Sequence, residues 1–240
     1  MVLFRSVLFY LGMAAATLVF VPLSLLLLPL PFPLRFRIIS RWSAFNLWSL
    51  KVICGLDFEV TGTEHIPEQA GIILCKHQSA WETLALQLVF PPQVWVLKRE
   101  LLWIPIYGWG LAAMAPIAID RAAGIRALRQ IVAGGKDRLA RGIWVVIFPE
   151  GTRVAPGKRG RYQPGGGMLA AETGCPVVPV AHNSGYFWPR NSLRKRPGTI
   201  RLVIGPVIDS KGKSADEITR QAEQWIESTV AQLPAPAPLN

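Results

Sequence analysis

The feature that most constrains this chain is an uncharged N-terminal stretch of 29 residues, from Ser6 to Leu34. Residues 6–28 are mostly Leu, Val, Phe and Ala, and about 20 apolar residues are enough to cross a bilayer as a helix. The stretch is longer than the apolar core of a cleaved signal peptide, so we expect it to stay in the mature chain. Four prolines interrupt its second half, and they are compatible with either a kinked span or a re-entrant hairpin.

Basic residues flank this apolar stretch. Residues 1–56 carry five basic residues and no acidic residue. Because three arginines follow the stretch and only Arg5 precedes it, a spanning segment would keep the rest of the chain on the cytoplasmic side. Residues 36–54 place basic and apolar side chains on different sectors of a helix, which is typical either of an interfacial helix or of one packed on the protein's own core. We expect residues 1–56 to form a membrane anchor, with apolar segment 6–34 and amphipathic helix 36–54.

The chain has a net charge of +11, and its positive charge is concentrated in two regions. One is residues 1–56, and the other is residues 151–201, which hold nine basic residues against the single acid Glu172. Clustered positive charge suits nucleic acid, anionic lipid or a phosphorylated ligand. The membrane-grade apolar segment argues against nucleic acid, so we expect no nucleic-acid partner. Three scattered cysteines are too few for a disulfide framework or a zinc site, and no metal is expected. They are Cys54, Cys75 and Cys175.

From residue 57 onward, strand and helix patterns alternate. Such alternation predicts an α/β fold with a mixed, largely parallel sheet flanked by helices. We expect one domain over 57–233 and a tail over 234–240. Strands are predicted at 58–62, 71–75, 93–97, 115–119, 144–148, 177–181 and 200–205, and helices at 79–90, 106–114, 122–140, 166–173 and 215–232.

The stretch ILCKHQSAWETLAL (73–86) places His77 between a buried strand and the start of a helix. Ser79 to Glu82 fits the Ser-x-x-Glu capping pattern, so Glu82 has a structural explanation. His77 and Glu82 can meet only if His77 lies just outside the helix and folds over its first turn. One carboxylate would then cap the helix and hold the imidazole in one tautomer. The imidazole could act as a general base, a role worth about 10²–10⁴-fold in rate; a purely structural pair stays open.

Three further strand ends carry charged residues. FPEGTR (148–153) supplies Arg153, whose planar fork suits phosphate, and Gly151, which allows the backbone to approach a ligand closely. IDR (119–121) and LKRE (97–100) follow two other strands. Since ligands collect beyond the carboxyl ends of parallel strands, these clusters predict an anion site beside the histidine.

In order, His-x-x-x-x-acid, Ile-Asp-Arg, Phe-Pro-Glu-Gly-Thr-Arg and Val-Val-Pro-Val resemble the motif series of the glycerolipid acyltransferases. The likeness extends from about residue 57 to 208 and is most specific in FPEGTR combined with the histidine motif. It is similar above all to the members that act on lysophosphatidic acid (1-acylglycerol-3-phosphate). The resemblance implies transfer of a fatty acyl group from acyl-CoA or acyl carrier protein to the free hydroxyl of that lipid, giving phosphatidic acid. It implies no cofactor beyond the acyl thioester, and location at the inner membrane with the catalytic domain on its cytoplasmic face.

The resemblance also implies roles for individual residues. His77 would be the base and Glu82 its orienting partner, although the family usually has Asp at the second position and the extra methylene of Glu changes the reach. The thioester oxyanion also requires a donor, which the motifs do not identify; a backbone N–H near 149–152 is one candidate. The implied substrate-binding residues are Lys98, Arg121, Glu150, Gly151, Thr152 and Arg153.

Several alternatives remain open at this point. The acceptor could instead be glycerol-3-phosphate or another lysolipid, such as a lyso-ornithine lipid, and a non-catalytic membrane-binding module is a third possibility. Cys75 could form an acyl-enzyme with His77, but core packing is favoured for it. His182 could line the site, but a structural role is favoured. The basic loops 157–161 and 190–196 are either solvated or hold anionic headgroups, acyl carrier protein or coenzyme A phosphates.

Overall fold

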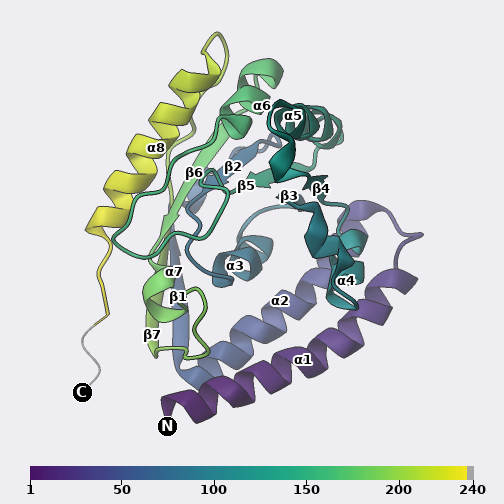
Figure 1. The fold of residues 1–240 in the computed structure, drawn as a ribbon, viewed down its shortest axis with the longest axis vertical. Helices are drawn as coiled ribbons and strands as arrows, with labels where there is room; N and C mark the ends of the chain where they lie inside the picture. The colour runs from purple at the N-terminus through teal and green to yellow at the C-terminus, as the bar shows by residue number, and fades with distance from the viewer. Residues whose placement is uncertain (237–240) are drawn as a thin grey trace.

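The computed structural model describes residues 1–236. Its N-terminal part is a hairpin of two long helices, α1 (Val2–Leu26) and α2 (Phe32–Cys54), which lie side by side along the outside of the molecule (Figure 1). Helix α1 continues through Pro22, and the chain turns over residues 27–31. Within the described residues, α1 is the one helix long and apolar enough to cross a membrane, with a mean hydropathy of 2.0 in its most apolar window.

Seven strands form one sheet in the order β1-β7-β6-β2-β5-β3-β4. Every neighbouring pair is parallel except β6 and β7. The predicted mixed, largely parallel sheet is therefore confirmed. The strands are β1 (Leu56–Thr61), β2 (Ile72–Cys75), β3 (Gln93–Lys98), β4 (Ile117–Ile119), β5 (Trp144–Ile147), β6 (Val177–His182) and β7 (Gly198–Ile204).

Helices cover both faces of the sheet (Figure 1). Side chains alternate along β2, so Ile73 and Cys75 pack in the core beneath α2 and α3, while Ile72 and Leu74 pack in a second core with α5, α6 and α8. Every strand and helix predicted after residue 57 is present, with ends shifted by at most three residues. The helices are α3 (Trp81–Val89), α4 (Tyr107–Ala113), α5 (Ile125–Ala140), α6 (Gly165–Thr173), α7 (Ser184–Phe187) and α8 (Ala215–Gln232).

Helix α1 is fixed against the rest of the chain by specific contacts. Its Thr17 hydroxyl accepts a hydrogen bond from the Trp42 indole of α2 at 3.2 Å. Gly110 of α4 lets α1 approach closely, because a Cβ at that position would lie only 2.9 Å from a methyl carbon of Val21. A buried lysine, Lys195, donates its backbone N–H to the hydroxyl of Ser6 at 2.8 Å. The helix hairpin is thus packed onto the α/β part of the molecule.

Helix α2 has two different faces. One face is buried against the core and includes Leu47 and Leu50. The other exposes Arg37 and Arg41 together with Trp48, whose side chain is 59% exposed. The helix therefore both packs on the protein's own core and presents a basic and aromatic surface outward.

Candidate active site

His77 lies in the loop after β2, and Glu82 lies in the first turn of α3. The Nδ1 atom of His77 is 2.8 Å from Oε1 of Glu82. A carboxylate only accepts hydrogen bonds, so Nδ1 carries the proton and Nε2 keeps its lone pair. The ring of Phe148 stacks on the imidazole, with 4.1 Å between centroids and 17° between planes. The predicted contact across five residues is present, and it holds the imidazole in one tautomer and one plane.

The Glu82 carboxylate is fully buried and surrounded by hydrogen-bond donors. Its Oε1 also accepts the backbone N–H groups of Gln78 and Ser79 at 3.0 and 2.8 Å. Its Oε2 accepts the hydroxyl of Ser184 at 3.1 Å. The same carboxylate therefore holds the turn that leads into α3 and orients the histidine; the N-cap itself is Ala80, one residue beyond Ser79.

Two imidazoles act on the ionisation of Glu82. Burial by itself raises the pKa of this carboxyl, but His182 and the hydrogen bond from His77 outweigh that effect and leave the pKa below its ordinary value. His182 is itself fully buried, which lowers its pKa, and its Nε2 donates to the carbonyl of Lys76 at 2.7 Å. Glu82 is therefore charged at neutral pH, and His182 has the structural role that was favoured for it.

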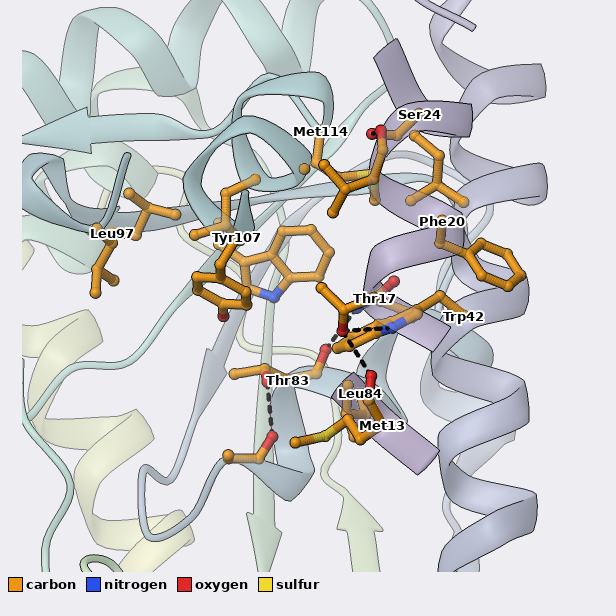
Figure 2. Close-up of a pocket in the computed structure, with 18 of the residues that line it drawn as sticks. Met13, Thr17, Phe20, Ser24, Trp42, Thr83, Leu84, Leu97, Tyr107 and Met114 are labelled. Carbon is orange, nitrogen blue, oxygen red and sulfur yellow. Dashed lines mark hydrogen bonds between the residues drawn. The ribbon is translucent and has the colours of Figure 1, made fainter. Parts of the chain in front are cut away.

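A cavity of about 310 Å³ opens beside His77. Its lining is mostly apolar and comes from α1, α2, α3, β3 and α4. Figure 2 shows Thr17 and Ser24 of α1 on one side of it and Leu97 and Tyr107 on the other. The N-terminal hairpin thus forms one wall of the cavity that contains the histidine. An apolar space of this kind suits a hydrocarbon chain.

Arg121 and Arg153 line the same cavity as His77. Arg121 follows β4, and its guanidinium donates to the carbonyl of Gly151 in the loop after β5. Both guanidiniums carry a permanent positive charge and can form paired hydrogen bonds to a phosphate. The ends of β4 and β5 therefore both contribute an arginine to the cavity that His77 lines, as predicted. The lining of this cavity is mostly apolar, and its polar groups include these two cations.

Glu150 occupies a different place from these arginines. It is buried, with 6% of its surface exposed, and it does not line the cavity. Its carboxylate lies 3.1 Å from the ammonium of Lys76 and accepts the backbone N–H of His77 at 3.2 Å. Glu150 can therefore affect an acceptor in the cavity only indirectly, by fixing the position of the loop to which it belongs.

The remaining predicted substrate-binding residues lie around this loop and at the end of β3. Gly151 has a positive φ of 66°, and its N–H donates to the carbonyl of Phe148, so that N–H is not available as an oxyanion donor. The hydroxyl of Thr152 accepts from Arg190 at 3.3 Å. Lys98 is half exposed, pairs with Glu100 at 3.2 Å and does not line the cavity.

Cys75 lies in the core beneath α3 and does not line the cavity. Burial and the nearby carboxylates raise the pKa of its thiol well above the ordinary value. Because the thiolate is the nucleophilic form, this cysteine is poorly suited to covalent catalysis. Core packing, the favoured explanation, agrees with its position.

Several residues of the site were not identified from the sequence. Ser184 holds Glu82 from 102 residues further along the chain, and no local pattern marks it. The contribution of α1 to the cavity also depends on tertiary packing. Lys76 did carry a signal, because a lysine that directly follows an apolar strand, on its buried face, needs a counter-charge.

Comparison with known proteins places this arrangement in a family. The sequence model of the acyltransferase family matches residues 57–183. The chain is 45% identical over 234 residues to the 1-acyl-sn-glycerol-3-phosphate acyltransferase of Pseudomonas aeruginosa, covering 95% of this chain and 91% of that protein. It is 28% identical over 181 residues to the human 1-acyl-sn-glycerol-3-phosphate acyltransferase alpha, covering 74% of this chain and 64% of the human one.

A solved structure shares the whole fold. The crystal structure of the 1-acyl-sn-glycerophosphate (LPA) acyltransferase PlsC from Thermotoga maritima superposes with a TM-score of 0.81 at 24% identity, and the match covers 100% of both chains. The helix hairpin and the α/β part therefore occur together in that protein as well. With a family match over more than half of its length and a relative at 45% identity along nearly all of it, this chain belongs to the acyltransferase family.

Proposed function

We propose that this chain transfers a fatty acyl group from an acyl-CoA or acyl carrier protein thioester to the free hydroxyl of lysophosphatidic acid, giving phosphatidic acid. The observation that carries the proposal is the cavity itself. It is apolar along α1 and α4, and its lining also includes His77, Arg121 and Arg153. A lysophosphatidic acid has one hydrocarbon chain, one hydroxyl and one phosphate, and these match the three parts of the cavity. The names of the similar proteins from Pseudomonas and human support the same acceptor.

The chemistry follows from the tautomer of His77. Its Nε2 removes the proton from the acceptor hydroxyl as the oxygen attacks the thioester carbonyl, and Glu82 stabilises the imidazolium that forms. A tetrahedral oxyanion results, and its collapse breaks the carbon–sulfur bond. The thiolate leaves and takes up the proton from the imidazolium, so the histidine is regenerated. The step uses only groups of the chain, the acceptor hydroxyl and the thioester, and it needs no cofactor.

The positive charges position the acceptor in this scheme. Arg121 and Arg153 bind the phosphate, and Lys98 would add a contact only after leaving Glu100. The oxyanion requires a separate donor. Within 149–152, Pro149 has no N–H and the N–H of Gly151 is already used, which leaves the backbone of 150 and 152.

The membrane is the second partner in the proposal. Helix α1 exposes large apolar side chains along its outer face, including Phe4 at 73% and Leu11 at 64%. Arg37 and Arg41 of α2 are exposed as well. Apolar and basic side chains together suit an anionic bilayer surface. We place the protein at the inner membrane, with the α/β part on the cytoplasmic face, where both substrates are met.

A panel of acceptors tests the proposal. Purified protein in phospholipid vesicles is given acyl-CoA or acyl carrier protein thioester, and the release of free thiol is followed with lysophosphatidic acid, glycerol-3-phosphate or a lyso-ornithine lipid. Release that depends on lysophosphatidic acid, with phosphatidic acid as product, is expected. Preference for another acceptor would reassign the substrate. No release with any acceptor and either donor would instead support the membrane-binding module.

A further inference from the structure

The strand that delivers His77 also delivers a buried cation. Residues 72–75 of β2 alternate between the two cores, and the alternation continues past the strand end. Lys76 follows on the side of α8, whereas His77 opens onto the cavity on the side of α1 and α3. The Lys76 side chain is 0% exposed. A fully buried ammonium requires charged partners, and those of Lys76 lie next to the strand end that carries His77.

Two carboxylates and a phenol surround the Lys76 ammonium. Its Nζ lies 2.6 Å from Oε1 of Glu227 on α8 and 3.1 Å from Oε1 of Glu150. The hydroxyl of Tyr162 donates to the same oxygen of Glu227 at 2.9 Å. Glu227 is 16% exposed, so the cluster reaches from the surface of α8 to a point directly behind the histidine.

The inner end of this cluster contacts the main chain of His77. Glu150 accepts the backbone N–H of His77 at 3.2 Å, and the His77 carbonyl accepts the N–H of Val154 at 2.8 Å. These two bonds hold the histidine's own peptide groups against the loop 148–154. The same loop supplies Phe148, which stacks on the imidazole, and Arg153, which lines the cavity. The position of Glu150 therefore sets how the base and one cation stand relative to each other.

We propose that Lys76, Glu227 and Tyr162 are positioning residues for the acyl transfer, and that through Glu150 they couple the C-terminal helix α8 to the placement of His77 and the 148–154 loop. None of the three lines the cavity, so none is expected to contact substrate. The inference rests on the proposed function, because its readout is the rate of that reaction. It assigns α8 a part in catalysis, although α8 lies on the opposite face of the sheet from the cavity (Figure 1).

The position of Glu223 provides a matched control. Glu223 lies one turn before Glu227 on α8 and also pairs with a cation, but its partner is Arg159, whose side chain is 65% exposed. Glu223→Gln and Glu227→Gln remove the same charge from the same helix. Glu227→Gln changes a residue in direct contact with Lys76 and Tyr162, whereas the hydrogen bonds of Glu223 go to Arg159.

The experiment compares steady-state kinetics of the full-length protein in phospholipid vesicles, with lysophosphatidic acid and acyl-CoA as substrates. Glu227→Gln is expected to lower kcat by about 10-fold or more, since small misplacements of a reacting group are costly. KM for lysophosphatidic acid is expected to change by less than about twofold, because the cavity lining is intact. Glu223→Gln is expected to keep both constants. Tyr162→Phe, which removes only the outer hydrogen bond, is expected to lower kcat by a smaller factor.

The outcomes separate this inference from the function on which it rests. If the unsubstituted protein transfers no acyl group, the proposed function fails. If it is active and Glu227→Gln keeps its kcat while only its melting temperature falls, the cluster is merely structural and the inference is overturned. A rise in KM at constant kcat would also overturn it. Should Glu227→Gln fail to fold, Tyr162→Phe decides, because a kcat equal to that of the unsubstituted protein would contradict the inference.

Discussion

At the scale of single residues, the site depends on one carboxylate oxygen. Oε1 of Glu82 accepts from His77 Nδ1 and from two backbone N–H groups at the start of α3. Glu82→Gln keeps a side-chain oxygen for the cap but removes the charge that stabilises an imidazolium. We expect acyl transfer to fall by about 100-fold, within the range typical of general-base catalysis. The measurement is kcat with lysophosphatidic acid, and unchanged turnover would contradict the role of Glu82 in orienting a base.

Because the pKa of Glu82 is below its ordinary value, we expect the free energy of unfolding to depend on pH through this residue. A carboxyl whose pKa is lower in the folded than in the unfolded protein stabilises the fold above its unfolded pKa, here about 4.5. That contribution is lost as the pH falls through the folded value. The free energy of unfolding of detergent-solubilised protein should therefore differ most between unsubstituted protein and Glu82→Gln at pH 7. The difference should shrink below pH 4.5, and a difference independent of pH would contradict the assignment.

The residues of the site were predictable from sequence to the extent that their contacts are local. His77 and Glu82 are five residues apart at a strand-to-helix turn, so the capping pattern constrained their geometry. Arg121 and Arg153 were found because parallel strand ends converge on one edge. Ser184 and Glu227 could not be found in this way, because each reaches the site from more than 100 residues away.

At the scale of helices and strands, the close packing of α1 on α4 can be tested by substitution. A Cβ at Gly110 of α4 would stand 2.9 Å from Val21 of α1, whereas a Cβ at Gly12 of α1 meets nothing within 4 Å. Gly110→Val should push α1 away from α4, destabilise the protein by about 1–3 kcal/mol and reduce activity by opening the cavity. Melting temperature and acyl transfer measure both effects. Gly12→Ala is the control, and equal behaviour of the two variants would contradict a close α1–α4 contact.

The sequence constrained the α/β elements more tightly than the hairpin. Strand and helix patterns after residue 57 are local, and each predicted element is present. The apolar stretch is compatible with a kinked span or a re-entrant hairpin, and the way residues 1–56 pack on the rest of the chain depends on contacts made elsewhere. One of them is Lys195, whose ammonium lies 4.5 Å from the ring centroid of Tyr10 and 4.6 Å from that of Trp188. Burial lowers the pKa of Lys195 to about 8, and no pattern in residues 1–56 foretells this contact.

At the scale of the whole molecule, helix α1 lies between the outer surface of the protein and the cavity. The outer face of α1 is apolar, whereas its inner face lines the cavity through residues such as Met13, Thr17 and Ser24 (Figure 2). His77 lines the same cavity. If the outer face of α1 docks on a bilayer, as proposed above, the bilayer and the cavity lie on opposite sides of this one helix. Among the residues that the structure describes, α1 is the one helix long and apolar enough to cross a membrane, and it is also packed against the α/β part of the molecule.

This arrangement predicts how the protein partitions onto vesicles. Leu11 and Leu18 are 64% and 59% exposed on α1, and Val207, which follows β7 in the sequence, is 41% exposed. A fully buried leucine side chain is worth about 1.5–3 kcal/mol, so Leu11→Ser with Leu18→Ser should lower partitioning by about tenfold or more. Flotation with vesicles that contain anionic lipid measures this. Val207→Ser should float like the unsubstituted protein, and equal flotation of all three would argue against docking through α1.

The central claim is that His77, held by Glu82 beside two arginines, removes the proton from the hydroxyl of a lysophosphatidic acid. The most direct measurement is phosphatidic acid formation from lysophosphatidic acid and acyl-CoA or acyl carrier protein thioester, by unsubstituted protein and by His77→Ala in the same vesicles. The unsubstituted protein is expected to form product, and the variant is expected to lose about 10²–10⁴-fold in rate, with folding and flotation unchanged. Product formed at an equal rate by His77→Ala would contradict it.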